Sequence, residues 1–185
     1  TGIAPVAAAG TLPAGSAEFV KLTVLAVILR ACGLPEQYPQ AQFCFWLKEK
    51  GYYDEVRGTV EAAGKSWDKE LNSMYASGLI GDKLIELDPD FAKDTREARQ
   101  VLRQTFPARS ADISTPEFLG AARQALEVNG ELPLTILVLD EVQQYIGDSH
   151  DRAVMITELA EAIQTQLDGR VMLVASGQSA LTGTP

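Results

Sequence analysis

A run of six residues, Leu134 to Leu139, leads directly into two acids, Asp140 and Glu141, and constrains the fold more than any other feature. The run is mostly branched and apolar, and no Lys or Arg stands beside the two acids, called the acidic pair below. Such a run is typical of a strand buried on both faces, as in a parallel sheet covered by helices. We therefore expect an α/β fold with the acidic pair at the carboxyl end of a strand, where open parallel sheets bind ligands.

A second apolar run, Arg170 to Ala175, ends in small polar residues that include Ser176 and Gln178. Between the two runs, Ser149 to Leu167 has apolar residues at helical spacing, with Ser149 placed as the N-cap. Strand, helix and strand in this order predict a βαβ unit with parallel strands and a right-handed crossover. Ser176 and Gln178 should then lie at the same end of the sheet as the acidic pair.

Two adjacent acids at such a strand end have defined roles in nucleotide hydrolases. The first holds Mg²⁺, and the second orients or deprotonates the attacking water. This Walker B pattern predicts Asp140 as the metal residue (through water), Glu141 as the catalytic residue, and Ser176 or Gln178 as the nucleotide sensor, with ATP and Mg²⁺ as cofactors. An acidic pair also caps strands and begins turns without any chemistry, and that interpretation stays open at this point.

A phosphate-binding loop is missing from the sequence. A P-loop nucleotidase needs Gly-x-x-x-x-Gly-Lys-Ser/Thr, whose backbone N–H groups and Lys hold the phosphates. Gly64-Lys65-Ser66 resembles the end of this motif, but the required first Gly falls on Thr59. We interpret Gly64 as a helix end and Ser66 as the N-cap of the next helix. The stretch from Gly10 to Ser16 has no Lys at the needed place, and we expect a strand-to-helix loop there.

A Walker B pattern without a Walker A motif suggests a fragment of a larger domain. The chain begins at Thr1 without Met and ends at Pro185 just after a strand. In the ASCE class of P-loop ATPases the sheet order is 5-1-4-3-2, so three strands of this chain should be contiguous in chain order: Ile3 to Ala9, Leu134 to Leu139, and Arg170 to Ala175. The expected organisation is one fragment with a first strand and loop at 1–15, a large helical insertion at 16–130, and the Walker B strand, helix and sensor strand at 131–185.

The insertion is expected to be entirely helical. The predicted helices are Glu18 to Cys32, packed on the sheet, then Tyr38 to Lys50, Tyr52 to Ala63, Trp67 to Leu79, Asp90 to Phe106, and Thr115 to Asn129. Asp88-Pro89 should begin the fifth of these, a capping box of Ser114 and Glu117 should begin the sixth, and Gly130 should end it. We expect the aromatic residues between Phe43 and Tyr53 to pack in a core rather than form a partner surface.

Charge and composition argue against two classes of protein, nucleic-acid-binding domains and membrane proteins. The net charge is −9 with scattered Lys and Arg, which does not provide the basic face of a nucleic-acid-binding domain. The longest apolar run, Leu22 to Leu29, is too short for a membrane span, so no membrane contact is expected. Two thiols, Cys32 and Cys44, in an acidic chain fit a reducing compartment, and we expect a cytoplasmic protein.

Two segments, Leu139 to Asp148 and Ser176 to Leu181, resemble the large P-loop ATPases of bacterial phage-resistance systems, particularly the BREX type. Shorter matching text occurs at Gly10 to Gly15 and Tyr38 to Ala41. The resemblance implies ATP hydrolysis in defence against phage, with the site roles given above. It also implies other defence-system proteins as partners, DNA contacted through regions outside this chain, and a homo-oligomer. By analogy alone, Gln143, Gln144 and Tyr145 would contact a neighbouring subunit or DNA.

Two other functions stay open. In the first, the chain is a non-catalytic protein-interaction module on an α/β scaffold, and the acidic pair is structural. In the second, weaker one, the chain is a helicase-like motor, because Asp140-Glu141-Val142-Gln143 is similar to helicase motif II; no other helicase motif occurs in the sequence.

Overall fold

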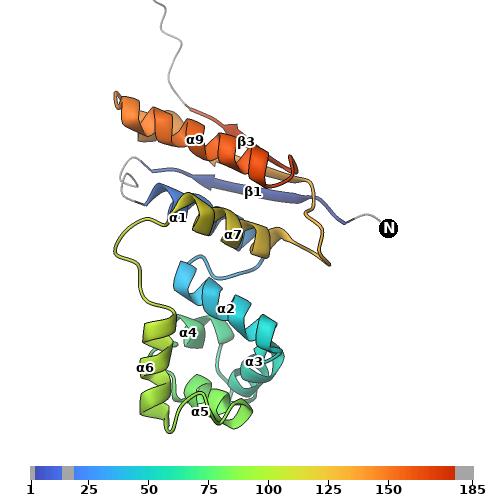
Figure 1. Ribbon diagram of the computed structural model, residues 1–185, viewed down its shortest axis with the longest axis vertical. Coiled ribbons are helices and arrows are strands. Elements are labelled where there is room, and N and C mark those ends of the chain that lie inside the picture. Colours follow the sequence, from blue (N-terminus) through green and yellow to red (C-terminus); the bar gives the residue numbers. More distant parts are fainter. Residues whose placement is uncertain (1–2, 14–18, 178–185) are drawn as a thin grey trace, which may run out of the picture. The chain divides into compact units, whose positions relative to one another are not determined.

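The computed structural model describes residues 3–13 and 19–177 (Figure 1). Its fold class is α/β, as expected, with a three-stranded parallel sheet and nine helices in the described residues. By internal contacts the chain divides into two compact units. Residues up to 36 and from 111 onward form the first, called the sheet unit, and residues 37–110 form the second, called the helical unit. Each unit is described by itself.

The sheet unit contains three parallel strands in the order β1-β2-β3. They are β1 (Val6–Thr11), β2 (Thr135–Asp140) and β3 (Val171–Ala175). The prediction of three contiguous strands in chain order is therefore confirmed. The strand-to-helix loop expected from Gly10 was placed too early, because Gly10 and Thr11 belong to β1 and pair with Leu139 and Asp140. A side chain at position 10 would come within 2.4 Å of Val27 Cγ2, so a glycine there lets helix α1 approach the strand.

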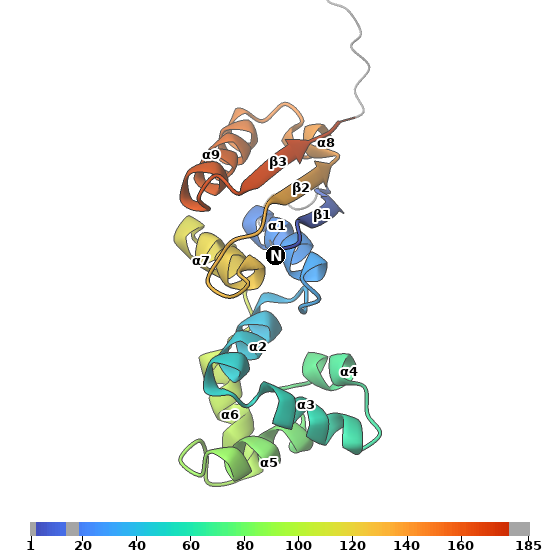
Figure 2. The same ribbon diagram turned by 90° about the vertical axis from the view of Figure 1, so that its right-hand side faces the viewer.

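Three helices form one layer against this sheet: α1 (Val20–Ala31), α7 (Thr115–Leu126) and α9 (His150–Gln166). Helix α1 packs on β1 and α9 packs on β3, while α7 contacts both α1 and α9 (Figure 2). The predicted N-terminal signals are confirmed, since Ser114 and Glu117 form a capping box and the Ser149 hydroxyl accepts from Arg152 N. A short helix, α8 (Val142–Ile146), follows β2.

The expectation that β2 is buried on both faces is wrong for the described structure. Thr135, Leu137 and Leu139 are buried against the helices, whereas Ile136 is 50% exposed. On β3, Met172 and Val174 are 62% and 40% exposed in the same way. Both crossovers advance in the same direction across the sheet, so two right-handed crossovers place their helices on the same face. We call the uncovered side the open face.

The helical unit contains α2 (Tyr38–Lys50), α3 (Tyr53–Ala62), α4 (Trp67–Asn72), α5 (Gly78–Leu87) and α6 (Thr95–Thr105). In the sheet unit, α7 ends at Leu126 with Glu127 as its C-cap, so the predicted end at Asn129 and Gly130 is wrong. Two predicted boundaries in the helical unit are wrong as well. The helix expected from Trp67 to Leu79 is two helices, because the Ser77 hydroxyl accepts from Ile80 N and begins α5. The helix expected from Asp90 begins at Thr95 instead, because the Asp94 carboxylate accepts from Glu97 N at 2.8 Å and acts as its N-cap.

The Gly64-Lys65-Ser66 segment is a turn between helices, as predicted, and not a phosphate-binding loop. Gly64 has φ +73° and its N–H donates to Glu61 O at 2.9 Å, which ends α3. Ser66 is the N-cap residue of α4. The Lys65 ammonium lies 3.3 Å from the Glu70 carboxylate. These contacts account for all three residues without a phosphate.

The aromatic residues pack within the helical unit. Phe43 is fully buried and lies edge-on to Phe106, with ring centroids 5.4 Å apart, and the Trp46 ring contacts the rings of Phe91 and Phe106. Core packing was the expectation, and it is confirmed for Phe43.

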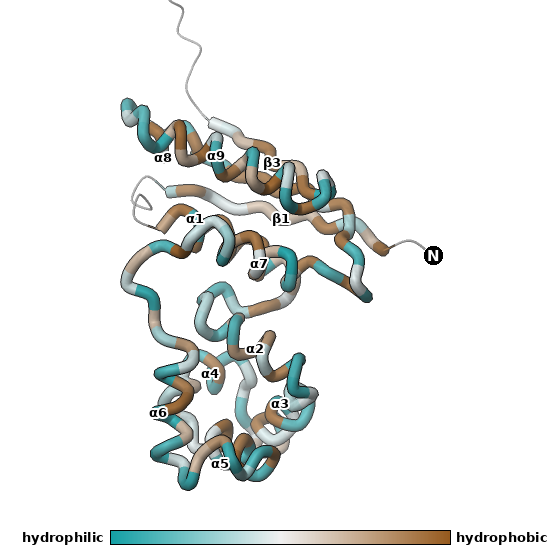
Figure 3. The backbone as a smooth tube through the Cα atoms, in the orientation of Figure 1, coloured by the Kyte–Doolittle hydropathy of each residue, from teal (hydrophilic) through white to brown (hydrophobic). Residues whose placement is uncertain are grey.

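The neighbouring Cys44 is also buried, and this burial raises the pKa of its thiol to about 12. Apolar residues likewise run along α1 in the sheet unit (Figure 3). None of the helices in the described residues is long and apolar enough to cross a membrane.

Candidate functional site

The carboxyl ends of the three strands bring Thr11, Asp140 and Ser176 into one row. Thr11 is the register partner of Asp140 on β1, and Ser176 directly follows the β3 residue that pairs with Leu139. Alternate residues of a strand point to opposite faces. Because Leu139 is buried against the helices, Asp140 and its two row neighbours lie on the open face. The predicted meeting of Asp140 and Ser176 at one end of the sheet is therefore seen.

The Asp140 carboxylate is held by two donors at one oxygen. The Ser176 hydroxyl donates to Asp140 Oδ1 at 2.5 Å, and Glu141 N donates to the same oxygen at 2.8 Å. The backbone of Ser176 is fixed as well, since its N–H donates to Leu139 O and its carbonyl accepts from Val142 N. The carboxylate thus has a defined orientation, with Oδ2 left outside these two hydrogen bonds.

These donors change the acidity of the group. The pKa of Asp140 is lowered below its usual value, first by the Ser176 hydroxyl and second by the Glu141 backbone N–H, both of which stabilise the ionised form. Asp140 is therefore negatively charged at neutral pH. A cation at this strand end would meet an ionised carboxylate that is already oriented.

Replacing Ser176 with alanine is expected to raise the pKa of Asp140 toward its usual value, because the largest stabilising donor is lost. A lowered folded-state pKa contributes stability above the unfolded-state pKa and loses it as the pH falls through the folded-state value. The stability difference between wild type and Ser176→Ala should therefore be present at neutral pH and absent in strong acid. Carboxyl ¹³C NMR titration measures the pKa, and Ser176→Thr, which keeps a hydroxyl, is the control. An Asp140 pKa that is unchanged in Ser176→Ala would disprove the contact.

Glu141 has a strained backbone. Its φ is +61° and ψ is 18°, the left-handed region that side chains other than Asn and Asp rarely occupy. The other non-glycine residues with positive φ among the described residues are Asn129 and Asp168, which tolerate this region in turns. Strain of this kind costs on the order of 1–3 kcal/mol and is found at functional sites more often than elsewhere. The sequence contained no signal for this geometry.

The segment after Glu141 is tightly packed. Tyr145 is fully buried, and its carbonyl accepts from the Arg152 guanidinium at 2.9 Å. The expectation that Tyr145 contacts a neighbouring subunit or DNA is therefore wrong, because the Tyr145 side chain lies in the core of the sheet unit. Gln143 and Gln144 are exposed. Gly177 lies against Gln143, since a side chain at position 177 would come within 2.8 Å of Gln143 Cβ.

Two residues complete the comparison with the predicted site. Gln178, the second predicted sensor, lies outside the described residues. Thr11 was missed, because the sequence around it was interpreted as a loop. If the predicted strand had ended at Thr11 and not at Ala9, the prediction would have placed the Thr11 hydroxyl beside Asp140.

The donors that meet here suit a weakly coordinated hard cation. One ionised carboxylate lies between two hydroxyl-bearing residues, and no group of three or more His, Cys, Asp or Glu residues that could hold a metal occurs in the described part of the chain. Mg²⁺ in nucleotide sites keeps most of its waters and uses one or two carboxylates together with substrate phosphates. The residues present fit Mg²⁺ bound in that way. Comparisons of the chain with protein-family models and with solved structures gave no match.

Proposed function

We propose that the sheet unit carries the metal- and water-positioning half of an ATP-hydrolysing site of the Walker B type. One observation supports this most: Ser176 on one strand end holds the Asp140 carboxylate ionised and oriented on the next. The adjacent Glu141 is held in a strained conformation, as expected for a residue placed for chemistry. Strand ends of parallel sheets are where such ligands bind.

Each residue has a specific role in this proposal. Asp140 binds the waters of Mg²⁺, which when bound neutralises charge on the phosphates. Glu141 orients the attacking water and accepts its proton, so that the water is placed in line with the terminal phosphate. Ser176 is a positioning residue through its hydrogen bond to Asp140, and it is also the proposed sensor of the terminal phosphate.

Phosphate binding requires residues beyond those of this chain, since the sequence contains no Walker A motif. We therefore propose that the chain acts as part of a larger P-loop ATPase that supplies this loop. The resemblance to BREX-type ATPases supports placing that activity in resistance to phage, with other defence proteins as partners. A cytoplasmic location accords with the two cysteines, neither of which is in a disulfide.

Manganese tests the metal site in this chain directly. Adding Mn²⁺ should broaden the NMR amide signals of Asp140, Glu141 and Ser176 before those of other acidic segments, because Mn²⁺ binds the same oxygen donors as Mg²⁺ and is paramagnetic. Asp140→Asn should remove this selectivity. Its matched control is Asp148→Asn, which removes one carboxylate from a nearby exposed position. If the line broadening in wild type and in both variants depends only on how many carboxylates lie near each amide, the site is refuted.

The open face supports a second candidate, a non-catalytic interaction module. Ile136, Met172 and Val174 are exposed on a sheet face that a protein partner could cover. In that case Asp140 would be structural. Asp140→Asn would then leave partner binding unchanged, whereas charged substitutions of Met172 or Val174 would abolish it.

A further inference from the structure

Ser176 holds the residues on both sides of Glu141. The Ser176 carbonyl accepts from Val142 N at 3.1 Å, and the Ser176 hydroxyl donates to Asp140 Oδ1 at 2.5 Å. Its N–H donates to Leu139 O at 2.9 Å, which continues the pairing of β3 with β2. The hydrogen bonds of this one residue thus reach Leu139, Asp140 and Val142, and Glu141 lies between the last two.

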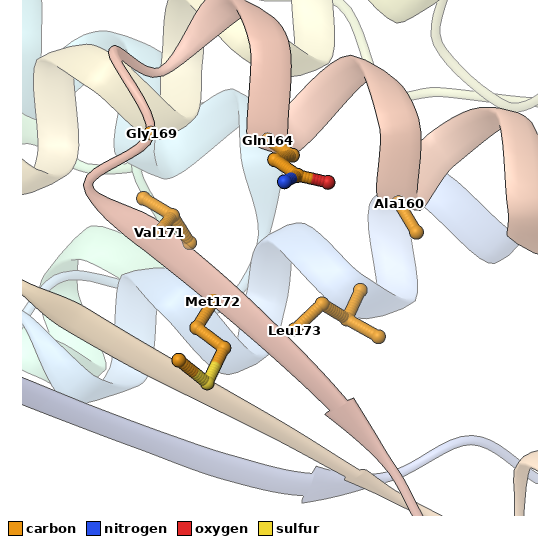
Figure 4. A pocket seen from close by; sticks show the side chains of 6 residues that line it. All are labelled: Ala160, Gln164, Gly169, Val171, Met172 and Leu173. Atoms are coloured by element: carbon orange, nitrogen blue, oxygen red, sulfur yellow. The ribbon is translucent and has the colours of Figure 1, made fainter.

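The alternation of side chains along β3 shows on which face Ser176 acts. In Figure 4, Leu173 points toward Ala160 of α9, and Met172 points away from it. Met172 and Ser176 therefore share the open face, because alternate residues of a strand point to opposite faces. A hollow of about 240 Å³ lies between α9 and the first half of β3 (Figure 4). It is therefore away from the strand end at which Ser176 meets Asp140.

Gly177 lies against Gln143, the second residue of α8. A Cβ atom at position 177 would come within 2.8 Å of Gln143 Cβ and within 2.9 Å of Gln143 Oε1. The φ of Gly177 lies outside the left-handed region, so its backbone conformation does not require glycine. The close approach to the Gln143 side chain is what requires a residue without a Cβ here.

We propose that Gly177 is a positioning residue for Glu141. Because residue 177 has no side chain, it lies close enough to α8 for the carbonyl of Ser176 to reach Val142 N. That hydrogen bond fixes the peptide group that follows Glu141, and the bond from Glu141 N to Asp140 Oδ1 fixes the group that precedes it. Strained conformations persist only where the surrounding structure over-determines them. The two fixed peptide groups hold Glu141 at φ +61° and thereby set the direction of its Cα–Cβ bond.

The consequence for catalysis rests on the proposed function, whereas the backbone coupling does not. Gly177→Ala should displace Ser176, break its hydrogen bond to Val142 and let Glu141 relax to a negative φ. In the larger ATPase this variant should lower kcat by about 100-fold, the cost of moving a catalytic group by about 1 Å. The KM for ATP should stay nearly constant, because the phosphate-binding loop lies outside this chain. A raised KM with an unchanged kcat would overturn the positioning role.

NMR of this chain measures the backbone of Glu141 directly, through Cα and Cβ chemical shifts and the coupling between N–H and Hα, which depend on φ. Gly177→Ala should move these values toward those of a negative φ. Adding Gln143→Gly should restore them, because both close contacts come from the Gln143 side chain. Adding Gln143→Ala should not, because the Cβ of residue 143 remains. The matched control is Gly120→Ala in α7, where an added Cβ has open space.

A stability cycle tests the same coupling by a second route. Glu141→Gly relieves the strain and should stabilise the wild-type chain, but it should add no stability after Gly177→Ala, which has already released that strain. Chemical denaturation of the four proteins measures this difference.

Three results would overturn the proposal. The first is equal stabilisation by Glu141→Gly in both backgrounds, and the second is a Glu141 φ that Gly177→Ala leaves unchanged. The third is a chain that Gly177→Ala unfolds and Gln143→Gly does not restore, because residue 177 would then support the fold through another contact. An absence of selective Mn²⁺ broadening at Asp140 would instead refute the metal site and leave these results unaffected.

Discussion

Replacing Glu141 with glutamine is expected to lower ATP turnover by about 100- to 10,000-fold, the usual contribution of a general base. Glutamine has the shape of glutamate but cannot accept a proton from the attacking water. The measurement is steady-state phosphate release by the larger ATPase of which we propose this chain to be part. ATP binding should persist in the variant, since Asp140 and its hydrogen bond to Ser176 are unchanged.

The Glu141→Gly variant distinguishes the effect of backbone strain on stability from the role of the side chain in ATP turnover. Glu141→Gly also removes the base, so turnover should be lost to the same extent. Glycine adopts φ +61° without the steric cost of a side chain, so stability should rise by about 1 kcal/mol. Glutamine at this position keeps the strain and should leave stability unchanged. Chemical denaturation of this chain measures both variants, and a loss of stability in Glu141→Gly would show that the side chain supports the fold instead.

Leu137→Ala is expected to destabilise the sheet unit by about 2–5 kcal/mol. Leu137 is fully buried in the central strand, with Ala8 and Leu173 as its register partners on either side. Truncation leaves a cavity between the sheet and its helix layer, and the surrounding structure closes such cavities only in part. Urea unfolding followed by circular dichroism gives the free energy of unfolding.

The neighbouring residue is the matched control. Ile136 is 50% exposed on the open face, so Ile136→Ala removes fewer buried contacts and should cost about 1 kcal/mol or less. The difference between the free energies of unfolding of the two variants measures how much more buried the helix face of the sheet is than the open face. Equal costs in the monomeric chain would mean that the open face is covered, which contradicts the burial described above.

Local signals in the sequence determined much of the sheet unit. The apolar runs before Asp140 and Ser176 predicted two parallel strands whose polar ends meet, because run length and the right-handed crossover depend on short stretches of chain. The capping box of Ser114 and Glu117 and the N-cap at Ser149 were predicted for the same reason. So was the turn at Gly64, since the phosphate-loop spacing fails at Thr59.

Other features depended on contacts between distant residues. The extent of β1 was set by pairing with β2, and the apolar content of β2 did not reveal that one of its faces stays open. Hydrophobic pattern shows which residues can be buried, but only the placement of the helices decides which of them are. The left-handed conformation of Glu141 and the burial of Tyr145 also arise from packing after the strand. Asp140, Glu141 and Ser176 could thus be predicted from the sequence, whereas Thr11, the strained backbone of Glu141 and the lowered pKa of Asp140 came from the tertiary structure.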